Sequence, residues 1–239
     1  MAELGELHER IRERSPLPSA ETETLIRTRF ARVPQRLAFG LRRWGLDRKA
    51  VLDVGCSYGY CLAHFGPGSV GIENHGEPVE FCRALGFDAR LLDVDTGVAE
   101  VVPDEAFDVV WISDLLEHLD APRLLLRDLA TKLKPDGKLI VYVTALPRSR
   151  VARALLRRRR LEPYAAEAHH YQFTEETIRY LVERSGYRVE SVEVPFFGRL
   201  GRLLRAHSPR LFVVAAPDAS SRGLLERAEA RNKEPLLTS

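Results

Sequence analysis

From residue 50 onward, short apolar runs alternate with segments of helical spacing, and this alternation restricts the possible folds more than any other feature. Five such runs lie at residues 50–54, 69–72, 89–92, 107–112 and 138–143. Helical segments separate them, among them residues 78–85, which Gly86 follows, and residues 122–133. Strands that alternate with helices form a parallel sheet with helices on both faces, and nearly continuous apolar strands suit a sheet buried on both sides.

The segments after residue 144 add an insertion and complete the predicted sheet. Residues 145–173 interrupt the alternation with a basic helical segment, Pro163 and the polar run EAHHYQF. Thr174 then caps a helix that Gly186 ends, and two further strands are expected near 187–195 and 210–215. We therefore predict an α/β fold, a Rossmann-like, doubly wound, mostly parallel seven-stranded sheet with helices on both faces.

The chain divides into three predicted parts. Residues 1–45 form an N-terminal arm, whose first 20 residues are either a frayed helix or an extended arm, and a cap helix from Pro34 to Gly45. That helix would cover either the front of a ligand site or one face of the sheet. Residues 46–216 form the main domain, including the insertion at 145–173, and residues 217–239 form a polar C-terminal tail.

The composition is that of a soluble globular protein, with 45% hydrophobic and 29% charged residues among 239. Three cysteines are too few for a disulfide framework, and none forms a CxxC pair. The charged N-terminus lacks the apolar core of a signal peptide, and no run approaches the roughly 18 uncharged apolar residues of a membrane span. We therefore expect a cytoplasmic protein without a membrane span.

The stretch VLDVGCSYGY at residues 51–60 carries the strongest chemical signal. A strand ends at Val54, and Gly55 and Gly59 bracket a tight turn into a helix. Glycine lets the backbone approach a ligand closely, and a helix N-terminus adds unpaired N–H donors. The dinucleotide fingerprint would also need glycine at the positions of Ser57 and Tyr60, so this loop disfavours an NAD-dependent oxidoreductase.

Asp53 lies two positions before Gly55, the first glycine of this turn. With this acidic residue, the stretch resembles the first motif of the class I S-adenosylmethionine-dependent methyltransferases, which have a third glycine where Ser57 stands. The resemblance continues in order through residues 35–215 and makes residues 46–216 a methyltransferase domain. It implies that S-adenosylmethionine is the cofactor and that the loop holds its amino-acid end, with Asp53 near the ammonium. The cofactor-binding candidates in this loop are Asp53, Gly55, Cys56, Ser57, Tyr58 and Gly59.

Further cofactor-binding candidates follow the second, third and fourth strands. Glu73 lies just past the second strand, with Asn74 beside it, and a carboxylate there can accept hydrogen bonds from both ribose hydroxyls. Asp93 and Val94 follow the third strand, where the family reads the adenine amino group. Ser113 and Asp114 begin the loop that, by the same resemblance, faces the substrate.

Methyl transfer needs positioning, and an oxygen or nitrogen acceptor must also lose a proton to a base or near a metal. His118, His169 and His170 are the candidate catalytic residues. Asp114, Glu117 and His118 would share one face if their segment is helical, and with His169 they could hold a divalent cation. This arrangement is similar to ubiquinone-biosynthesis O-methyltransferases and small-RNA 3′-terminal 2′-O-methyltransferases, although Asp114 replaces their first glutamate. We predict no metal and keep these four residues as the candidates for one.

The acceptor is predicted to be a small molecule, methylated at oxygen or nitrogen, in a pocket formed by the insertion and the N-terminal helix. Six arginines between residues 150 and 160 form either a solvated helix face or a contact for an anionic acceptor. No basic–aromatic module accompanies this run, so we expect no nucleic acid partner. A metal-dependent RNA 2′-O-methyltransferase, a non-catalytic cofactor-binding subunit and an NAD-dependent oxidoreductase remain alternatives, and the oligomeric state is left open.

Overall fold

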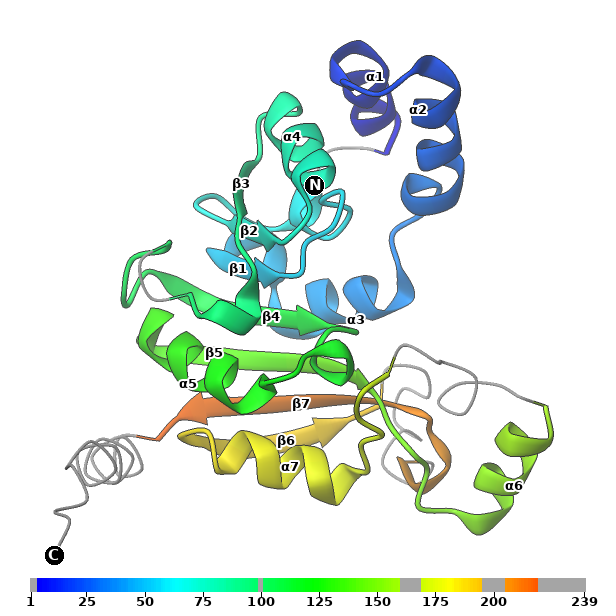
Figure 1. The fold of residues 1–239 in the computed structure, drawn as a ribbon, viewed down its shortest axis with the longest axis vertical. Helices are drawn as coiled ribbons and strands as arrows, with labels where there is room; N and C mark the ends of the chain where they lie inside the picture. The colour runs from blue at the N-terminus through cyan, green and yellow to red at the C-terminus, as the bar shows by residue number, and fades with distance from the viewer. Residues whose placement is uncertain (1–3, 99–100, 160–168, 195–204, 219–239) are drawn as a thin grey trace, which may run out of the picture.

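A central sheet of seven strands organises the molecule (Figure 1). The computed structural model describes residues 4–98, 101–159, 169–194 and 205–218. The strands are β1 (Val51–Val54), β2 (Val70–Glu73), β3 (Asp88–Leu91), β4 (Phe107–Ser113), β5 (Leu133–Thr144), β6 (Tyr187–Glu193) and β7 (Arg210–Pro217). Their order is β3-β2-β1-β4-β5-β7-β6, and β7 is antiparallel to both neighbours while the other pairs are parallel. The predicted mostly parallel sheet is confirmed.

Helices lie on both sides of this sheet. They are α1 (Leu4–Arg14), α2 (Ser19–Leu25), α3 (Gln35–Trp44), α4 (Gly76–Ala84), α5 (Pro122–Lys132), α6 (Arg150–Arg158) and α7 (Glu175–Glu183). A π-helix, η1 (Ile26–Phe30), directly continues α2. The helices predicted at 78–85 and 122–133 correspond to α4 and α5, and the Thr174 side chain caps α7 as expected.

Successive residues of one strand pack against helices on opposite faces of the sheet. In β4, Ile112 belongs to the apolar cluster that contains Leu126 of α5 and Ile178 of α7. Trp111, the preceding residue, belongs to the cluster on the other face, against which Phe39 of α3 packs. Because neighbouring side chains of a strand point in opposite directions, a strand buried on both faces requires an uninterrupted apolar run.

Helix α3 matches the helix predicted between Pro34 and Gly45 and fills one of the two expected roles, since it covers one face of the sheet. The helix stops where Gly45 adopts a left-handed φ of 63°. Its apolar side covers the sheet, and the ring of Trp44 lies 5.1 Å from that of Phe212 in β7. Its first turn reaches the carboxyl ends of the central strands, where Arg36 contacts residues of the candidate site.

The first 20 residues, expected to be a frayed helix or an arm, contain a helix that packs against the rest of the chain. Helix α1 is regular, and its Leu7 and Ile11 are buried in a cluster with Phe30 and Phe81. The two apolar residues are four positions apart and therefore share one side of the helix. Charged residues surround them in sequence, so the segment looks polar on average although it has one apolar stripe.

The insertion contains a basic helix, as predicted, in the form of α6. None of its residues is buried, and Figure 1 shows it apart from the layers that cover the sheet. Residues 160–168, which belong to the insertion, and the tail from residue 219 lie outside the described residues. The division of the chain after residues 45 and 216 stays a prediction. Within the described residues, none of the helices has the length and hydropathy needed to cross a membrane.

Candidate cofactor and acceptor site

The loop after β1 is held tightly against β2. The N–H groups of Gly55 and Cys56 both donate to the carbonyl of Ile72, at 2.8 and 3.0 Å. A side chain at Gly71 would bring its Cβ within 2.6 Å of the Cys56 Sγ, so the strand must have glycine there for the loop to lie this close. Ser57 has a φ of 48°, the left-handed conformation that favours glycine, so serine occupies a backbone position that is strained for a residue with a side chain.

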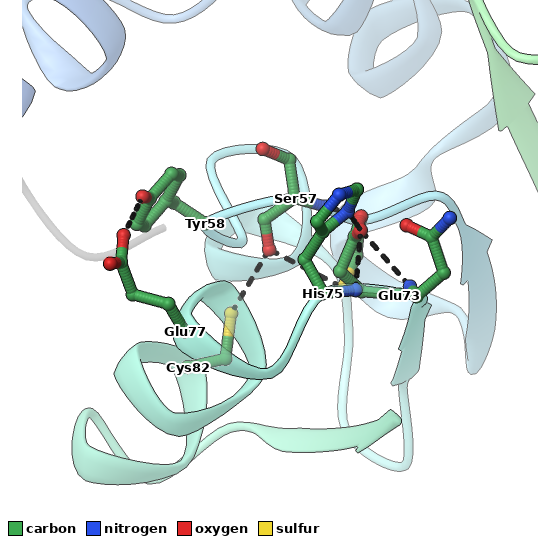
Figure 2. A network of polar contacts seen from close by, with 8 residues as sticks. Ser57, Tyr58, Glu73, His75, Glu77 and Cys82 are labelled. Carbon is green, nitrogen blue, oxygen red and sulfur yellow. Dashed lines mark hydrogen bonds and ion pairs between the residues drawn. The ribbon is translucent and has the colours of Figure 1, made fainter. Parts of the chain in front are cut away.

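Glu73, at the end of β2, fastens the loop through hydrogen bonds (Figure 2). Its Oε2 accepts from the Ser57 N–H at 3.0 Å, and its Oε1 accepts from the N–H groups of Asn74 and His75 at 3.0 and 3.1 Å. The buried carboxylate therefore accepts hydrogen bonds from the backbone of two segments, the loop after β1 and the turn after β2. Sequence reasoning assigned Glu73 to a ligand, and the structure adds this organising role within the loop.

Asp53 lies beneath the same loop and is 2% exposed. Its Oδ2 has no hydrogen-bond partner among the described residues. Burial raises the pKa of Asp53 to about 7; the nearby Arg36 charge acts in the opposite direction, and Glu73 raises the pKa further. A buried carboxylate oxygen without a donor is unfavourable, so Asp53 is a candidate for a ligand contact.

Arg36 is the residue that sequence reasoning missed. Its Nε donates to the Ser113 Oγ at 2.7 Å, its Nη2 donates to the Tyr60 hydroxyl at 2.9 Å, and its Nε lies 3.8 Å from the Asp114 Oδ2. Asp114 is also paired with Arg210 of β7. No local motif could have identified Arg36, because only the docking of α3 onto the sheet brings it to the ends of β1 and β4.

A cavity of about 160 Å³ joins the ends of β2 and β3 to the loop after β4. Several sequence-predicted residues meet in it, namely Gly55, Glu73, Asn74, Asp93, Val94 and His118. Asp93 is exposed, and its side chain accepts from the Asp95 N–H at 3.1 Å, which fixes the turn that follows β3. The carboxyl edge of three parallel strands thus brings together residues that are far apart in sequence.

The three candidate catalytic histidines do not form one group. The rings of His118 and His169 are in edge-to-face contact, with centroids 4.7 Å apart. His170 is separate, and its Nδ1 lies 3.0 Å from Asp120 Oδ1. Of the three, His118 lines the 160 Å³ cavity.

The four candidate metal ligands are not brought together. Residues 116–118 form a 3₁₀ helix, so Asp114 and Glu117 do not share the helical face on which the metal hypothesis depended. Asp114 is paired with Arg210, while Glu117 is 1% exposed and its Oε1 accepts from the Thr144 N–H at 3.2 Å. Burial raises the pKa of Glu117. Across the part of the chain that the structure describes, no three histidine, cysteine or acidic side chains are grouped to hold a metal.

A second, larger cavity of about 670 Å³ opens beside the cofactor loop. It is lined by residues of the N-terminal region, from Arg27 to Arg36, and by Tyr60 and Tyr142. The expectation that the insertion and the N-terminal helix together form the acceptor pocket stays a prediction, because residues 160–168 of the insertion lie outside the described residues. Among the described residues, this cavity has N-terminal residues in its wall and none from the insertion.

Comparison with known proteins agrees with this geometry. Residues 25–192 match a family described as a methyltransferase domain. The ubiquinone biosynthesis O-methyltransferase of Actinobacillus pleuropneumoniae is 34% identical over 106 residues, which cover 40% of this chain and 45% of that protein. The enzyme of the same name from Xanthomonas oryzae is 34% identical over 131 residues, covering 51% of this chain and 53% of that one. The chain thus spans about half the length of the curated relatives it matches.

A solved structure shows the same fold. The S-adenosylmethionine-dependent methyltransferase of Archaeoglobus fulgidus superposes with a TM-score of 0.54 at 20% identity, over 76% of this chain and 94% of that one. The family match covers well over half of the residues and includes the loop after β1, the ends of β2 and β3, and α3. The chain therefore belongs to the methyltransferase domain family.

Proposed function

We propose that this protein is an S-adenosylmethionine-dependent methyltransferase that acts on an oxygen or nitrogen of a small molecule. The observation that carries the proposal is the unpartnered Oδ2 of Asp53, a buried acceptor at the carboxyl end of β1 beside the glycine loop. The fully buried free cysteines suit a reducing compartment, and we expect the cytoplasm.

The residues present fit the chemistry of this cofactor. The carboxylate of Asp53 suits an ammonium group, and the guanidinium of Arg36, near the same loop, suits a carboxylate. Glu73 and Asp93 offer acceptors for ribose hydroxyls and an adenine amino group at the cavity that both residues line. When bound, the cofactor supplies an electrophilic methyl group on a sulfonium centre.

The proton of the acceptor needs a base, and we assign this role to His118. Its imidazole is exposed at the edge of the cavity that Glu73 and Asp93 line, and the assignment requires that the reacting hydroxyl or amine of the acceptor reach this edge from the neighbouring cavity. The ring of His169 packs against it and restricts its orientation. His170 is turned toward Asp120 and is given no part in proton transfer.

An acceptor panel tests the proposed reaction. Phenols, hydroxybenzoates and amines are incubated with methyl-labelled S-adenosylmethionine, and labelled product and S-adenosylhomocysteine are measured by mass spectrometry. Thermal shifts with S-adenosylhomocysteine and with NAD⁺ are recorded in parallel. We expect stabilisation by the first ligand alone and transfer to at least one acceptor; stabilisation by NAD⁺ alone would contradict the proposal.

Substitution of His118 tests the assigned base. His118→Ala is expected to lower kcat by about 100-fold or more, because a positioned general base contributes on that order, while the affinity for S-adenosylhomocysteine stays within about threefold. His170→Ala is the matched control, with both quantities unchanged. Equal losses of kcat in the two variants would remove His118 from this role.

A further inference from the structure

The cavity of about 670 Å³ beside the cofactor loop has an unusual wall. One side consists of η1 and the turn that follows it, and the other includes Tyr60 and Tyr142. The first turn of α3 closes one end with Arg36, whose guanidinium carbon lies 5.5 Å from the ring centre of Tyr60 and 5.8 Å from that of Tyr142. The cavity therefore adjoins the residues that we assign to the amino-acid end of the cofactor.

Four arginines line this cavity and no acidic residue does. Arg36 is engaged with the candidate site, whereas Arg27, Arg29 and Arg32 are exposed and form no ion pair within the described part of the chain. The acid closest to them in sequence on the preceding helix, Glu23, is paired with Arg12 at 2.7 Å. The wall thus carries three arginines without an ion pair to a described residue, although the charge of Arg27 acts on Glu23 and that of Arg29 acts on Tyr58.

The backbone presents these arginines in an unusual way. Arg27 and Arg29 belong to η1, a single π-helical turn, and Arg32 follows in the next turn. Short π-helical segments are rare in proteins and occur often at functional sites. The segment is anchored by Ile26 and Phe30, which are 6% and 2% exposed. The buried anchors fix the turn, and the arginines between and after them face the solvent side and the cavity.

We infer that Arg27, Arg29 and Arg32 bind a carboxylate or phosphate group of the methyl acceptor. The planar guanidinium presents several donors in a fork that matches these oxyanions, which is how arginine differs from lysine. Tyr60 and Tyr142 supply a wall for the rest of the acceptor. This inference rests on the proposed function, since it names the class of molecule that the same site methylates.

The shape of the site favours a small molecule over a nucleic acid. The arginines border one concave cavity, whereas binding of a nucleic acid requires a basic surface that extends along its phosphate backbone. The net charge of the whole chain is only +2. The arginine run of α6, which the sequence suggested as the anion contact, has no residue among those that line the cavity.

Binding of small anions to the protein saturated with S-adenosylhomocysteine tests the inference. The probes are benzoate and phenyl phosphate, with benzamide as the neutral ring of similar shape, and dissociation constants come from NMR chemical-shift titrations. We expect at least one of the two anions to bind more tightly than benzamide. Binding of benzoate alone assigns a carboxylate, and binding of phenyl phosphate alone assigns a phosphate.

A pair of charge-matched variants locates the site. The triple variant R27Q/R29Q/R32Q is expected to weaken binding of the anion by at least about tenfold, because it removes three charge-assisted donors. The control R157Q/R158Q/R159Q removes the same charge from exposed positions of α6 and the residue after it, and is expected to leave binding unchanged. Circular dichroism and the affinity for S-adenosylhomocysteine show whether each variant keeps its fold and cofactor site.

Three results would overturn the inference. The first is that neither anion binds more tightly than benzamide, and the second is that the α6 control loses as much affinity as R27Q/R29Q/R32Q. The third is that a short single-stranded RNA binds far more tightly than either anion at the same salt concentration and depends on the same three arginines. Failure of the proposed function is recognised separately, since wild-type protein would then not bind S-adenosylhomocysteine although the anion could still bind.

Discussion

The ionised carboxyl group of Asp53 opposes folding, and we propose that it serves cofactor binding. It is buried, one of its oxygens has no partner among the described residues, and its pKa is raised to about 7, chiefly by burial. An unsatisfied buried polar group destabilises a fold by about 1–3 kcal/mol, and more when the group is charged. Such an arrangement is expected where a ligand that carries the missing donor binds, because sites of this kind trade stability for function.

The pH dependence of stability tests this reading of Asp53. The pKa of Asp53 is higher in the folded than in the unfolded chain, so the folded state favours the protonated carboxyl. The stability that this preference contributes is complete below about pH 4 and is lost as the pH rises through about 7. Asp53→Asn removes this loss. Between about pH 5 and pH 8 the free energy of unfolding of the variant should improve relative to wild type by about 2–3 kcal/mol in the absence of ligand, measured by urea denaturation.

Asp108 provides a control of opposite sign. Burial alone would raise the pKa of its carboxyl, but hydrogen bonds from Lys134 and from the Ala50 N–H lower it below the usual value. Asp108→Asn is therefore expected to lose stability relative to wild type at neutral pH. A relative stability of Asp53→Asn that does not change with pH would contradict the burial of a titrating carboxylate at that position.

Helix α3 joins the packing of the sheet to the chemistry of the site. Its Phe39 and Trp44 pack on Phe212, and the same helix brings Arg36 to the ends of β1 and β4. A Cβ on Gly40 would lie 2.9 Å from Leu46 and 3.1 Å from Trp111, so the helix sits very close to the strand beneath it. The position of Arg36 is thus set by apolar contacts about one to two turns further along the helix.

Arg36 should matter for cofactor binding more than for stability. Arg36→Gln is expected to weaken binding of S-adenosylhomocysteine by about tenfold or more, because a charge-assisted pair with the carboxylate of the ligand is lost. Arg43→Gln on the same helix, whose partner Glu193 is 3.1 Å away at the surface, should leave affinity unchanged. Calorimetric titration measures both, and equal affinities for the two variants would exclude Arg36 from the cofactor site.

Elements with regular periodicity could be predicted from the sequence, and irregular ones could not. The strands β1, β2, β4 and β5 are apolar runs, and α7 has a capping threonine and a terminal glycine, so local signals sufficed. The segment from Leu116 to His118 is a 3₁₀ helix. The spacing of the acidic residues and histidines in this stretch does not distinguish such a short helix from an α-helix. The apolar stripe of α1 has only two residues, Leu7 and Ile11. It can be recognised as a buried surface only once its partners Phe30 and Phe81 are known.

The same distinction holds for the candidate site. Asp53 and Glu73 lie in the last two residues of β1 and β2 and Asp93 follows β3, so a parallel sheet must place them along one edge, and the motif order predicts this. Arg36 and Tyr142 approach that edge from α3 and β5, and their meeting depends on how the N-terminal region docks. Sequence patterns describe neighbours along the chain, whereas this half of the site is built from contacts between distant segments.

For the whole molecule, the order of the strands sets where ligands can bind. In an open parallel sheet, ligands bind beyond the carboxyl ends of the strands. Here the glycine loop after β1, the acids after β2 and β3 and the arginine-lined cavity all lie at that edge. A ligand held there contacts segments from the N-terminal helices to β5, so it should stabilise the folded chain as one unit, by about 2.7 kcal/mol at one hundred times its dissociation constant.

Calorimetric titration of the wild-type chain with S-adenosylhomocysteine, repeated with Asp53→Asn, measures whether the buried carboxylate holds the cofactor. We expect saturable binding with one ligand per chain, and an affinity that rises with pH up to about 7 as Asp53 loses its proton. In the variant, binding should be at least about tenfold weaker and independent of pH over the same range. Absence of binding to the wild-type chain, or equal affinity and equal pH dependence in the two proteins, would contradict this role of the carboxylate.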